Sequence, residues 1–314
     1  MKKKSLGIML TNRCNANCAM CGLSCSPQKN DVIDEKLLLK AIDEAKTVNI
    51  KRIGFSGGEA FLYPELLIKG SNYAKEKGFT VTVATNGFWG LWSKEKIDKI
   101  LSKASLDDVY FSIDAFHQEY VSLEAIRGAI AACRRCSIPC SVSIGEAKGK
   151  YDAADFIRSL GDTKYYTDMH IYPFYRVGKA KSLPADVFYP LRPVPPRCYD
   201  SSALGMRCDG LVYPCCSPAA FDTCLSFGNL KERSLSDMLK ENPCVDIFIL
   251  LHDSESFQKL MDIAIQKGIL AEADKALAPC VICNLMFGEK GYGILQKDAA
   301  NLYDELLIKR LFAN

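Results

Sequence analysis

The sequence of 314 residues lacks the features that mark several classes of protein. No apolar run reaches the ~18 residues of a membrane-spanning helix, and the apolar stretch after the basic start is too short for a signal peptide. Neither sign of charge dominates: 40 basic and 37 acidic side chains leave +3, which argues against a nucleic-acid or membrane surface. Hydrophobic residues make up 48%, which excludes a disordered chain. We expect a cytoplasmic globular protein with no nucleic-acid and no membrane partner.

Cysteine, in contrast, is abundant. The chain has 15 cysteines in 314 residues, a smaller fraction than the ~8–10% of small disulfide scaffolds. A chain of this length also needs no disulfides to fold. In a cytoplasmic protein such a surplus indicates metal or redox chemistry. The cysteines form four groups along the chain: Cys14, Cys18, Cys21 and Cys25; Cys133, Cys136 and Cys140; Cys198, Cys208, Cys215, Cys216 and Cys224; and Cys244, Cys280 and Cys283.

The first half of the chain alternates short apolar runs with longer amphipathic ones. The predicted strands are 5–11, 51–57, 79–85, 108–114, 140–145 and 169–174. The predicted helices are 34–48, 63–77, 94–104, 119–135 and 153–160, with Asp34 and Ser93 as N-caps. This α/β alternation predicts parallel strands with right-handed crossovers, as an α/β sheet or open barrel of about six units. Ligands of such folds bind at the carboxyl ends of the strands.

After residue 176 the pattern changes. Five prolines in 183–196 predict a linker on the surface. A hairpin is expected over 205–214, because Asp209-Gly210 is a favoured turn pair, and helices are expected near 234–240, 256–267 and 296–312. We therefore predict two domains, 1–180 and 181–314, the second being a small α+β domain.

Three thiols follow directly on the first predicted strand. Cys14, Cys18 and Cys21 have CxxxCxxC spacing, and thiolates are the preferred ligands of iron–sulfur clusters. Three ligands leave one iron of a four-iron cluster open to a small molecule. A structural zinc site or non-catalytic thiols are the alternatives. The spacing resembles the signature of the radical S-adenosylmethionine (SAM) enzymes, in which a partial (β/α)6 TIM-like barrel carries this motif.

Further motifs of that family follow successive strands in order. Gly57-Gly58-Glu59 resembles the family's GGE motif, in which backbone groups and the acid meet the SAM amino group, and Ser112 and Asp114 share one strand face toward the ribose. Met20 stands where the family usually has an aromatic residue and could lie against adenine. The resemblance implies these cofactor-binding residues: Met20, Ser56, Gly57, Gly58, Glu59, Thr85, Asn86, Ser112, Asp114, Glu146 and Arg176.

The late cysteines resemble the SPASM/twitch extension of radical SAM enzymes, which holds auxiliary clusters. Cys198 and Cys215 frame a C-x11-G-x4-C pattern, and Cys280 and Cys283 form a CxxC pair. The resemblance implies one auxiliary [4Fe–4S] cluster on these four thiols, hence two [4Fe–4S] clusters and SAM in all. Cys208 and Cys216 are rival ligands, and a four-thiolate zinc site is the main alternative.

The resemblance also implies an activity. Radical SAM enzymes cleave SAM reductively to methionine and a 5′-deoxyadenosyl radical, and SPASM/twitch members mostly modify ribosomal peptides or protein side chains. The chain is most similar to the YydG-like peptide epimerases, which convert L- to D-residues. Its expected partners are a ribosomally synthesised precursor peptide and a low-potential flavodoxin or ferredoxin. Cys224 belongs to no ligand pattern and is predicted to return a hydrogen atom to the opposite face of a Cα radical, with Asp209 positioning or resetting that thiol. The alternatives are a packed thiol or a substitute cluster ligand for Cys224, and a plain turn residue for Asp209.

Two other classes of function stay open at this point. The same parts could form a thioether or carbon–carbon crosslink or oxidise a protein side chain, and these reactions need an electron acceptor. The chain could also be a non-enzymatic protein that binds iron–sulfur clusters or zinc. The sequence names neither the peptide nor its binding site, although 225–279 or the open barrel edge could capture it.

Overall fold

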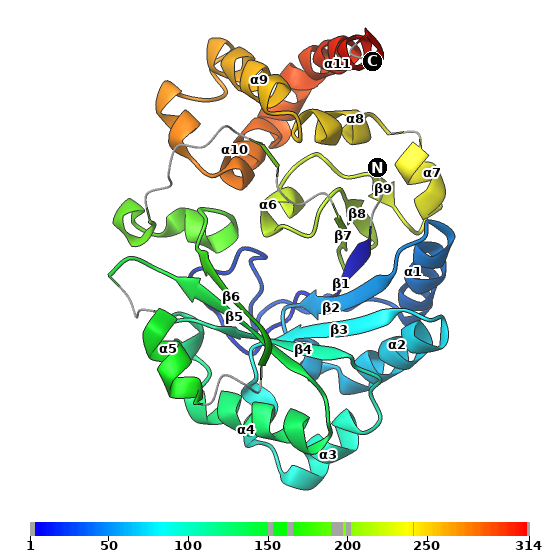
Figure 1. The fold of residues 1–314 in the computed structure, drawn as a ribbon, viewed down its shortest axis with the longest axis vertical. Helices are drawn as coiled ribbons and strands as arrows, with labels where there is room; N and C mark the ends of the chain where they lie inside the picture. The colour runs from blue at the N-terminus through cyan, green and yellow to red at the C-terminus, as the bar shows by residue number, and fades with distance from the viewer. Residues whose placement is uncertain are drawn as a thin grey trace.

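The computed structural model describes residues 4–149, 153–161, 166–189, 197–198, 202–240 and 242–312. Its centre is one curved, nine-stranded sheet (Figure 1). The strands are β1 (Ser5–Thr11), β2 (Arg52–Gly57), β3 (Thr80–Thr85), β4 (Asp108–Ile113), β5 (Cys140–Glu146), β6 (Tyr166–Pro173), β7 (Ala203–Met206), β8 (Leu211–Tyr213) and β9 (Gly228–Asn229). The first six strands are parallel and lie in chain order from β1 to β6, as the partial six-stranded barrel requires.

The C-terminal half adds to this same sheet. Strand β7 pairs in parallel with the free side of β1, and β8 and β9 continue from it in antiparallel fashion. The order is therefore β6-β5-β4-β3-β2-β1-β7-β8-β9. Backbone hydrogen bonds between β1 and β7 join the two halves of the chain into one sheet. The division into two domains at residue 180 stays a prediction.

Helices cover the outside of the barrel sheet and form a second layer beside β7–β9 (Figure 1). The barrel helices are α1 (Glu35–Thr47), α2 (Pro64–Glu76), α3 (Lys94–Leu101), α4 (Leu123–Arg135) and α5 (Ala153–Leu160). The C-terminal helices are α6 (Pro218–Phe221), α7 (Leu235–Lys240), α8 (Pro243–Leu250), α9 (Ser254–Gln266), α10 (Pro279–Met286) and α11 (Glu289–Phe312). Short 3-10 turns include η3 (His117–Glu119) and η5 (Gly178–Ser182).

Local sequence signals explain most element boundaries. The Asp34 carboxylate accepts from the first backbone N–H groups of α1, and the Ser93 hydroxyl caps α3, as predicted. The hairpin β7–β8 turns at Asp209-Gly210, where Gly210 has φ 96°. Two expectations need correction: α4 begins at Leu123 rather than 119, because Ser122 caps it, and α11 begins at Glu289 rather than near 296.

The sequence analysis also missed α8 and α10, which are short and apolar on most sides. Of the predicted linker, 190–196 lies outside the described residues. Among the helices that the structure does describe, none combines the length and the apolar character needed to cross a bilayer.

Candidate active site

A cavity of about 400 Å³ opens at the carboxyl ends of the barrel strands. Its walls include the ends of β2, β3, β4 and β6 and the cysteine loop after β1. Ser217, Pro218 and Cys280 extend the wall from the C-terminal half. The cavity therefore lies where an α/β barrel binds its ligands, and both halves of the chain contribute to it.

The cysteine loop presents four thiols to this cavity, those of Cys14, Cys18, Cys21 and Cys25. Burial raises the pKa values of Cys14 and Cys18 to about 12. A hydrogen bond from Cys25 lowers the pKa of Cys21 to about 6. The three thiols with CxxxCxxC spacing therefore share one buried wall, as three ligands of one cluster must.

A second segment holds the end of this loop in place. The Cys21 carbonyl accepts from the backbone N–H of Ser24 at 3.2 Å and from that of Lys179 at 3.0 Å. The Lys179 ammonium donates to the Cys25 carbonyl at 2.5 Å and to Asn17 Oδ1 at 2.6 Å. Residues from η5, more than 150 positions away in the sequence, thus fix the loop.

The glycines after β2 pack against the cysteine loop. The Gly58 N–H donates to the Thr11 carbonyl at 2.7 Å, and a Cβ at Gly58 would lie 1.9 Å from the Arg13 carbonyl oxygen. Gly57 has φ 135°, and a Cβ there would lie 2.3 Å from the Thr11 carbonyl oxygen. Both glycines line the cavity. Because neither has a side chain, the cysteine loop can approach the end of β2 closely.

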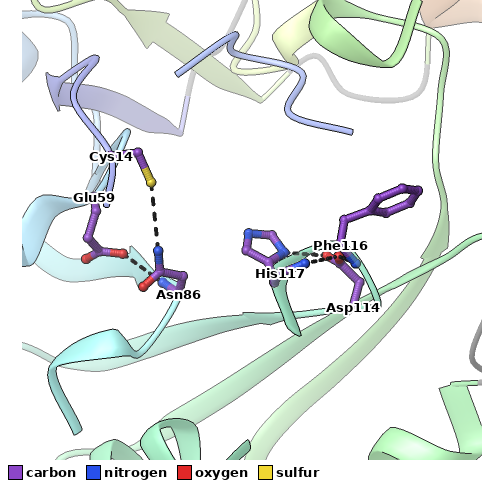
Figure 2. Close-up of polar contacts among 6 residues, drawn as sticks. All are labelled: Cys14, Glu59, Asn86, Asp114, Phe116 and His117. Atoms are coloured by element: carbon purple, nitrogen blue, oxygen red, sulfur yellow. Dashed lines mark hydrogen bonds and ion pairs between the residues drawn. The ribbon is translucent and has the colours of Figure 1, made fainter. Parts of the chain in front are cut away.

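The Glu59 carboxylate lies beneath this wall and is almost completely buried. It accepts from Phe61 N at 3.0 Å and from Thr85 Oγ1 at 2.9 Å. It also accepts from Asn86 N at 2.8 Å (Figure 2). Burial raises its pKa to about 7 in spite of these bonds. Asn86 in turn points its side-chain amide at Cys14 Sγ, 3.8 Å away (Figure 2).

A second buried carboxylate, Asp114, organises the turn after β4. Asp114 Oδ1 accepts from the backbone N–H groups of Phe116 and His117, both at 2.9 Å, and Oδ2 lies 2.5 Å from His117 Nδ1 (Figure 2). Burial lowers the pKa of His117, but the Asp114 charge and hydrogen bond outweigh it and the net shift is upward. His117 lines the cavity.

The predicted cofactor-binding residues divide into two sets. Those that line the cavity are Met20, Ser56, Gly57, Gly58, Thr85, Asn86 and Ser112. Those outside the described lining are Glu59, Asp114, Glu146 and Arg176, and Arg176 is exposed, with its guanidinium over the Phe188 ring.

Two acids belong to the second set. The carboxylates of Glu59 and Asp114 are not among the residues that line the cavity, and each accepts hydrogen bonds from backbone N–H groups. Their part in binding SAM stays a prediction. Sequence reasoning missed His117, whose signal is its place three residues after a strand-end Asp.

The four thiols predicted for the auxiliary site also come together. Cys215 follows β8 and interacts electrostatically with Cys198 and Cys280. Cys283 is half-buried next to the same three thiols, and loss of solvent around it raises its pKa. Cys280, one turn away at the start of α10, also lines the cavity.

The rival ligands are placed differently. Cys216 is exposed and next to Cys215, whereas the charged neighbours of Cys208 are Arg207, Asp209 and Asp31. In the described residues, no three Cys, His, Asp or Glu side chains converge tightly on one point. A four-iron cubane takes each thiolate at a separate corner, so it does not need that convergence.

The two predicted catalytic residues lie away from the described cavity lining. The Cys224 N–H donates to the Phe287 carbonyl at 2.8 Å, and the Cys224 carbonyl lies 3.8 Å from Cys244 Sγ. Asp209 pairs with Arg207 at 2.9 Å and caps the turn through Leu211 N. The structure thus gives Asp209 the role of a turn residue, and the predicted hydrogen-donor role of Cys224 stays a prediction.

Comparison with known families agrees with this geometry. Residues 8–144 match the radical SAM superfamily, and residues 198–264 match the SPASM iron–sulfur cluster-binding domain. The chain carries a radical SAM domain followed by a SPASM domain. The fold class and the family predicted from the motifs are confirmed.

Individual relatives cover most of the chain. YydG of Bacillus subtilis (strain 168), which is named for peptide biosynthesis, is 27% identical over 300 residues, 91% of this chain and 93% of its own. Streptococcus suis SuiB bound to its precursor peptide SuiA has a TM-score of 0.63 at 14% identity, covering 90% of this chain and 76% of SuiB. Native anSMEcpe with bound AdoMet has a TM-score of 0.56 at 12% identity, covering 96% and 99%. At these identities the two structures show a shared fold.

The domain pair implies SAM with a [4Fe–4S] cluster, and an auxiliary iron–sulfur site in the SPASM domain. The residues present fit both groups. Three thiols and the glycines of the GGE motif line one cavity, and four further thiols lie together beside it. Cys14, Cys18 and Cys21 would hold the first cluster, and Cys198, Cys215, Cys280 and Cys283 the second.

Proposed function

We propose that this protein is a radical SAM enzyme that modifies a ribosomally synthesised precursor peptide. The observation that carries the proposal is the shared cavity, in which the cluster loop and the auxiliary ligand Cys280 face the same space. The similarity to YydG along nearly the whole chain supports a peptide as substrate, and so does the fold shared with SuiB.

The cofactors, when bound, supply hydrogen-atom abstraction from a C–H bond, and the chain's task is to hold and shield the reacting groups. Apolar and aromatic side chains form much of the wall. Phe174 makes edge contacts with Phe116 and Tyr172, at centroid distances of 5.5 and 5.9 Å. Such a wall excludes water from a reactive intermediate.

Within this class we propose epimerization of L- to D-residues. The Cα hydrogen is removed on one face, and a thiol S–H returns a hydrogen atom to the other, so the substrate is neither oxidised nor reduced overall. The thiyl radical left on the protein takes one electron from the flavodoxin or ferredoxin and one proton from solvent to become a thiol again. Two thiols outside the proposed ligand sets bear on this step. Cys224 is the candidate from the sequence, and Cys25 lines the cavity.

One observation favours a second candidate, an oxidative crosslink within the peptide. Cys280 lines the cavity, so an auxiliary cluster on this thiol would lie next to the substrate. A cluster in that position suits an electron acceptor, which crosslinking needs and epimerization does not.

The test uses the anaerobically reconstituted enzyme, a flavodoxin, and any short peptide found to be encoded next to its gene, in heavy water. Epimerization gives a D-residue that carries one deuterium, whereas a crosslink removes two hydrogens. Cys224→Ala and Cys25→Ala are compared in the same assay, and the donor's variant loses the deuterated product while SAM cleavage continues. A peptide that stays unchanged while SAM is cleaved would contradict the proposal for that peptide.

A further inference from the structure

Two side chains that the proposed mechanism does not yet use lie beside Cys224. Cys244 is the second residue of α8 and is buried, and Tyr292 lies in the first turn of α11, which packs against α8 (Figure 1). The Tyr292 hydroxyl lies 3.5 Å from Cys244 Sγ, and Cys244 Sγ lies 3.8 Å from the Cys224 carbonyl oxygen. A buried thiol therefore lies between a phenol and the loop that carries the predicted hydrogen donor.

The hydrogens along these contacts point toward Cys224. The Cys244 S–H donates to the Cys224 carbonyl, so the Cys244 sulfur is left to accept the hydrogen of the Tyr292 hydroxyl. Burial raises the pKa values of Cys244 and Tyr292, so each group keeps its hydrogen near neutral pH. The Cys224 thiol acts electrostatically on both groups and therefore lies near them. Two neutral hydrogen carriers thus stand in series next to the predicted donor.

Backbone hydrogen bonds hold this arrangement in place. The Cys224 N–H donates to the Phe287 carbonyl at 2.8 Å. Asn242, the N-cap of α8, accepts from the Cys244 N–H at 2.9 Å, and its side-chain amide donates to the Phe227 carbonyl at 2.7 Å. Asn242 therefore ties the start of α8 to the loop that contains Cys224. The separation of the two cysteines is fixed by the fold rather than left to the rotation of their side chains alone.

We propose that Cys244 and Tyr292 form a hydrogen-atom relay that restores the Cys224 thiol after each turnover; the inference rests on the proposed epimerization with Cys224 as donor. The Cys224 thiyl radical takes the hydrogen of the Cys244 S–H, and the Cys244 thiyl radical then takes that of the Tyr292 O–H. S–H and phenolic O–H bonds are similar in strength, so both transfers are nearly balanced. The half-buried Tyr292 radical takes one electron from the flavodoxin or ferredoxin and one proton from solvent.

The test counts turnovers in heavy water, with the peptide that the wild type epimerizes in excess over the reconstituted enzyme. Tyr292→Phe and Cys244→Ser should each form a single deuterated D-residue per chain and then stop. The first variant has no phenolic hydrogen, and the second has an alcohol O–H bond that is too strong to yield one. The matched control is Tyr303→Phe, because Tyr303 also lies on α11 and interacts with Asp246 of α8. It should turn over as the wild type does.

Electron paramagnetic resonance checks the radical itself. With the clusters reduced once and the flavodoxin then left out, the wild type and Tyr303→Phe should accumulate a tyrosyl radical whose spectrum narrows with ring-deuterated tyrosine, and Tyr292→Phe should show none. Repeated turnover by Tyr292→Phe at the wild-type rate, or no D-residue even in its first turnover, would overturn the relay and leave epimerization standing. A wild type that forms no D-residue would refute epimerization itself, and the relay with it.

Discussion

The two sets of proposed cluster ligands are built in opposite ways. Cys14, Cys18 and Cys21 lie in one loop directly after β1, whereas Cys198, Cys215, Cys280 and Cys283 come from three separate parts of the chain. The first set needs one local loop to be held, and the second needs the C-terminal half to be folded. The spacing of the cysteines in the sequence brings the first set together, and tertiary packing brings the second set together.

The supports of the two sets differ accordingly. The early loop is fixed by backbone contacts to Gly58 and to the η5 segment. The auxiliary thiols depend on the docking of α10 against α6, where the buried Asn284 amide donates to the Ala219 carbonyl at 2.8 Å. Val177, next to η5, packs on the same small core as Ala219 and Val281. The two sites are therefore neighbours whose supports meet at Val177 but rest on different hydrogen bonds, so variants can break them one at a time.

The largest expected effect comes from removing the early thiols. The enzyme should hold about seven to eight irons per chain after anaerobic reconstitution, two four-iron clusters. Replacing Cys14, Cys18 and Cys21 together by Ala should remove one cluster and all SAM cleavage. Iron and sulfide analysis with spectroscopy of the reduced protein measures this. SAM cleavage by the triple variant would contradict the assignment.

The complementary change removes the auxiliary thiols. Cys280→Ala with Cys283→Ala should lower the iron content by one cluster and leave the first cluster and SAM binding in place. Cys208→Ala is the matched control, because the charged neighbours of Cys208 lie in the β7–β8 hairpin and at Asp31 rather than among the ligands. Equal iron loss from the control, or zinc in place of iron at the second site, would show that the ligand set is wrong.

This comparison also explains what the sequence could predict. The six barrel strands were located to within a few residues, because Val- and Ile-rich runs alternate with capped amphipathic helices. The CxxxCxxC loop was found from spacing alone. In contrast, α10 was missed although it carries Cys280 and Cys283, since a short apolar helix has no clear periodicity.

The direction of the side chains is the second feature that the sequence could not predict. A strand-end acid can point into the cavity or down into the wall, and the sequence does not separate the two. Glu59 and Asp114 both turn to backbone N–H groups, because a buried carboxylate without such partners would be costly. The cavity-facing role at the end of β4 then falls to His117, which spacing alone did not reveal.

A glycine variant tests the support of the early loop. Gly58→Ala would place a Cβ 1.9 Å from the Arg13 carbonyl oxygen and 2.9 Å from Cys14 N, so the loop must move away from β2. We expect a several-fold loss of the first cluster with the auxiliary cluster retained. Gly54→Ala, on β2 just before this turn, meets Thr82 Oγ1 at 3.3 Å and should have a much smaller effect. Equal cluster content in the two variants would show that the close approach is unimportant.

A smaller, pH-dependent effect is expected at Glu59. Its pKa is about 7 in the fold against about 4.5 in the unfolded chain, so the folded state binds the proton more tightly and loses stability as pH rises from about 4.5 through 7. The loss is a few kcal/mol at most, on the order of 1.4 kcal/mol for each unit of pKa difference. Glu59→Gln should abolish this component of the pH dependence. Unfolding by denaturant between pH 5 and 8 measures it, and an unchanged slope would mean that Glu59 is ionised throughout.

The smallest expected effect concerns Lys179, which links η5 to the cysteine loop. Its ammonium donates to the Cys25 carbonyl and to Asn17, and its positive charge lies close enough to lower the pKa values of Cys14 and Cys21. A nearby cation stabilises the more negative, reduced form of a cluster, so Lys179→Met should lower the reduction potential of the first cluster by tens of millivolts, on the order expected for a partly screened charge. The auxiliary potential should move less. Lys181→Met is the control, because Lys181 pairs with Asp222 at 3.4 Å on the surface. Redox titration followed by spectroscopy separates the two clusters, and equal shifts in both variants would mean that the effect is one of net charge and not of this contact.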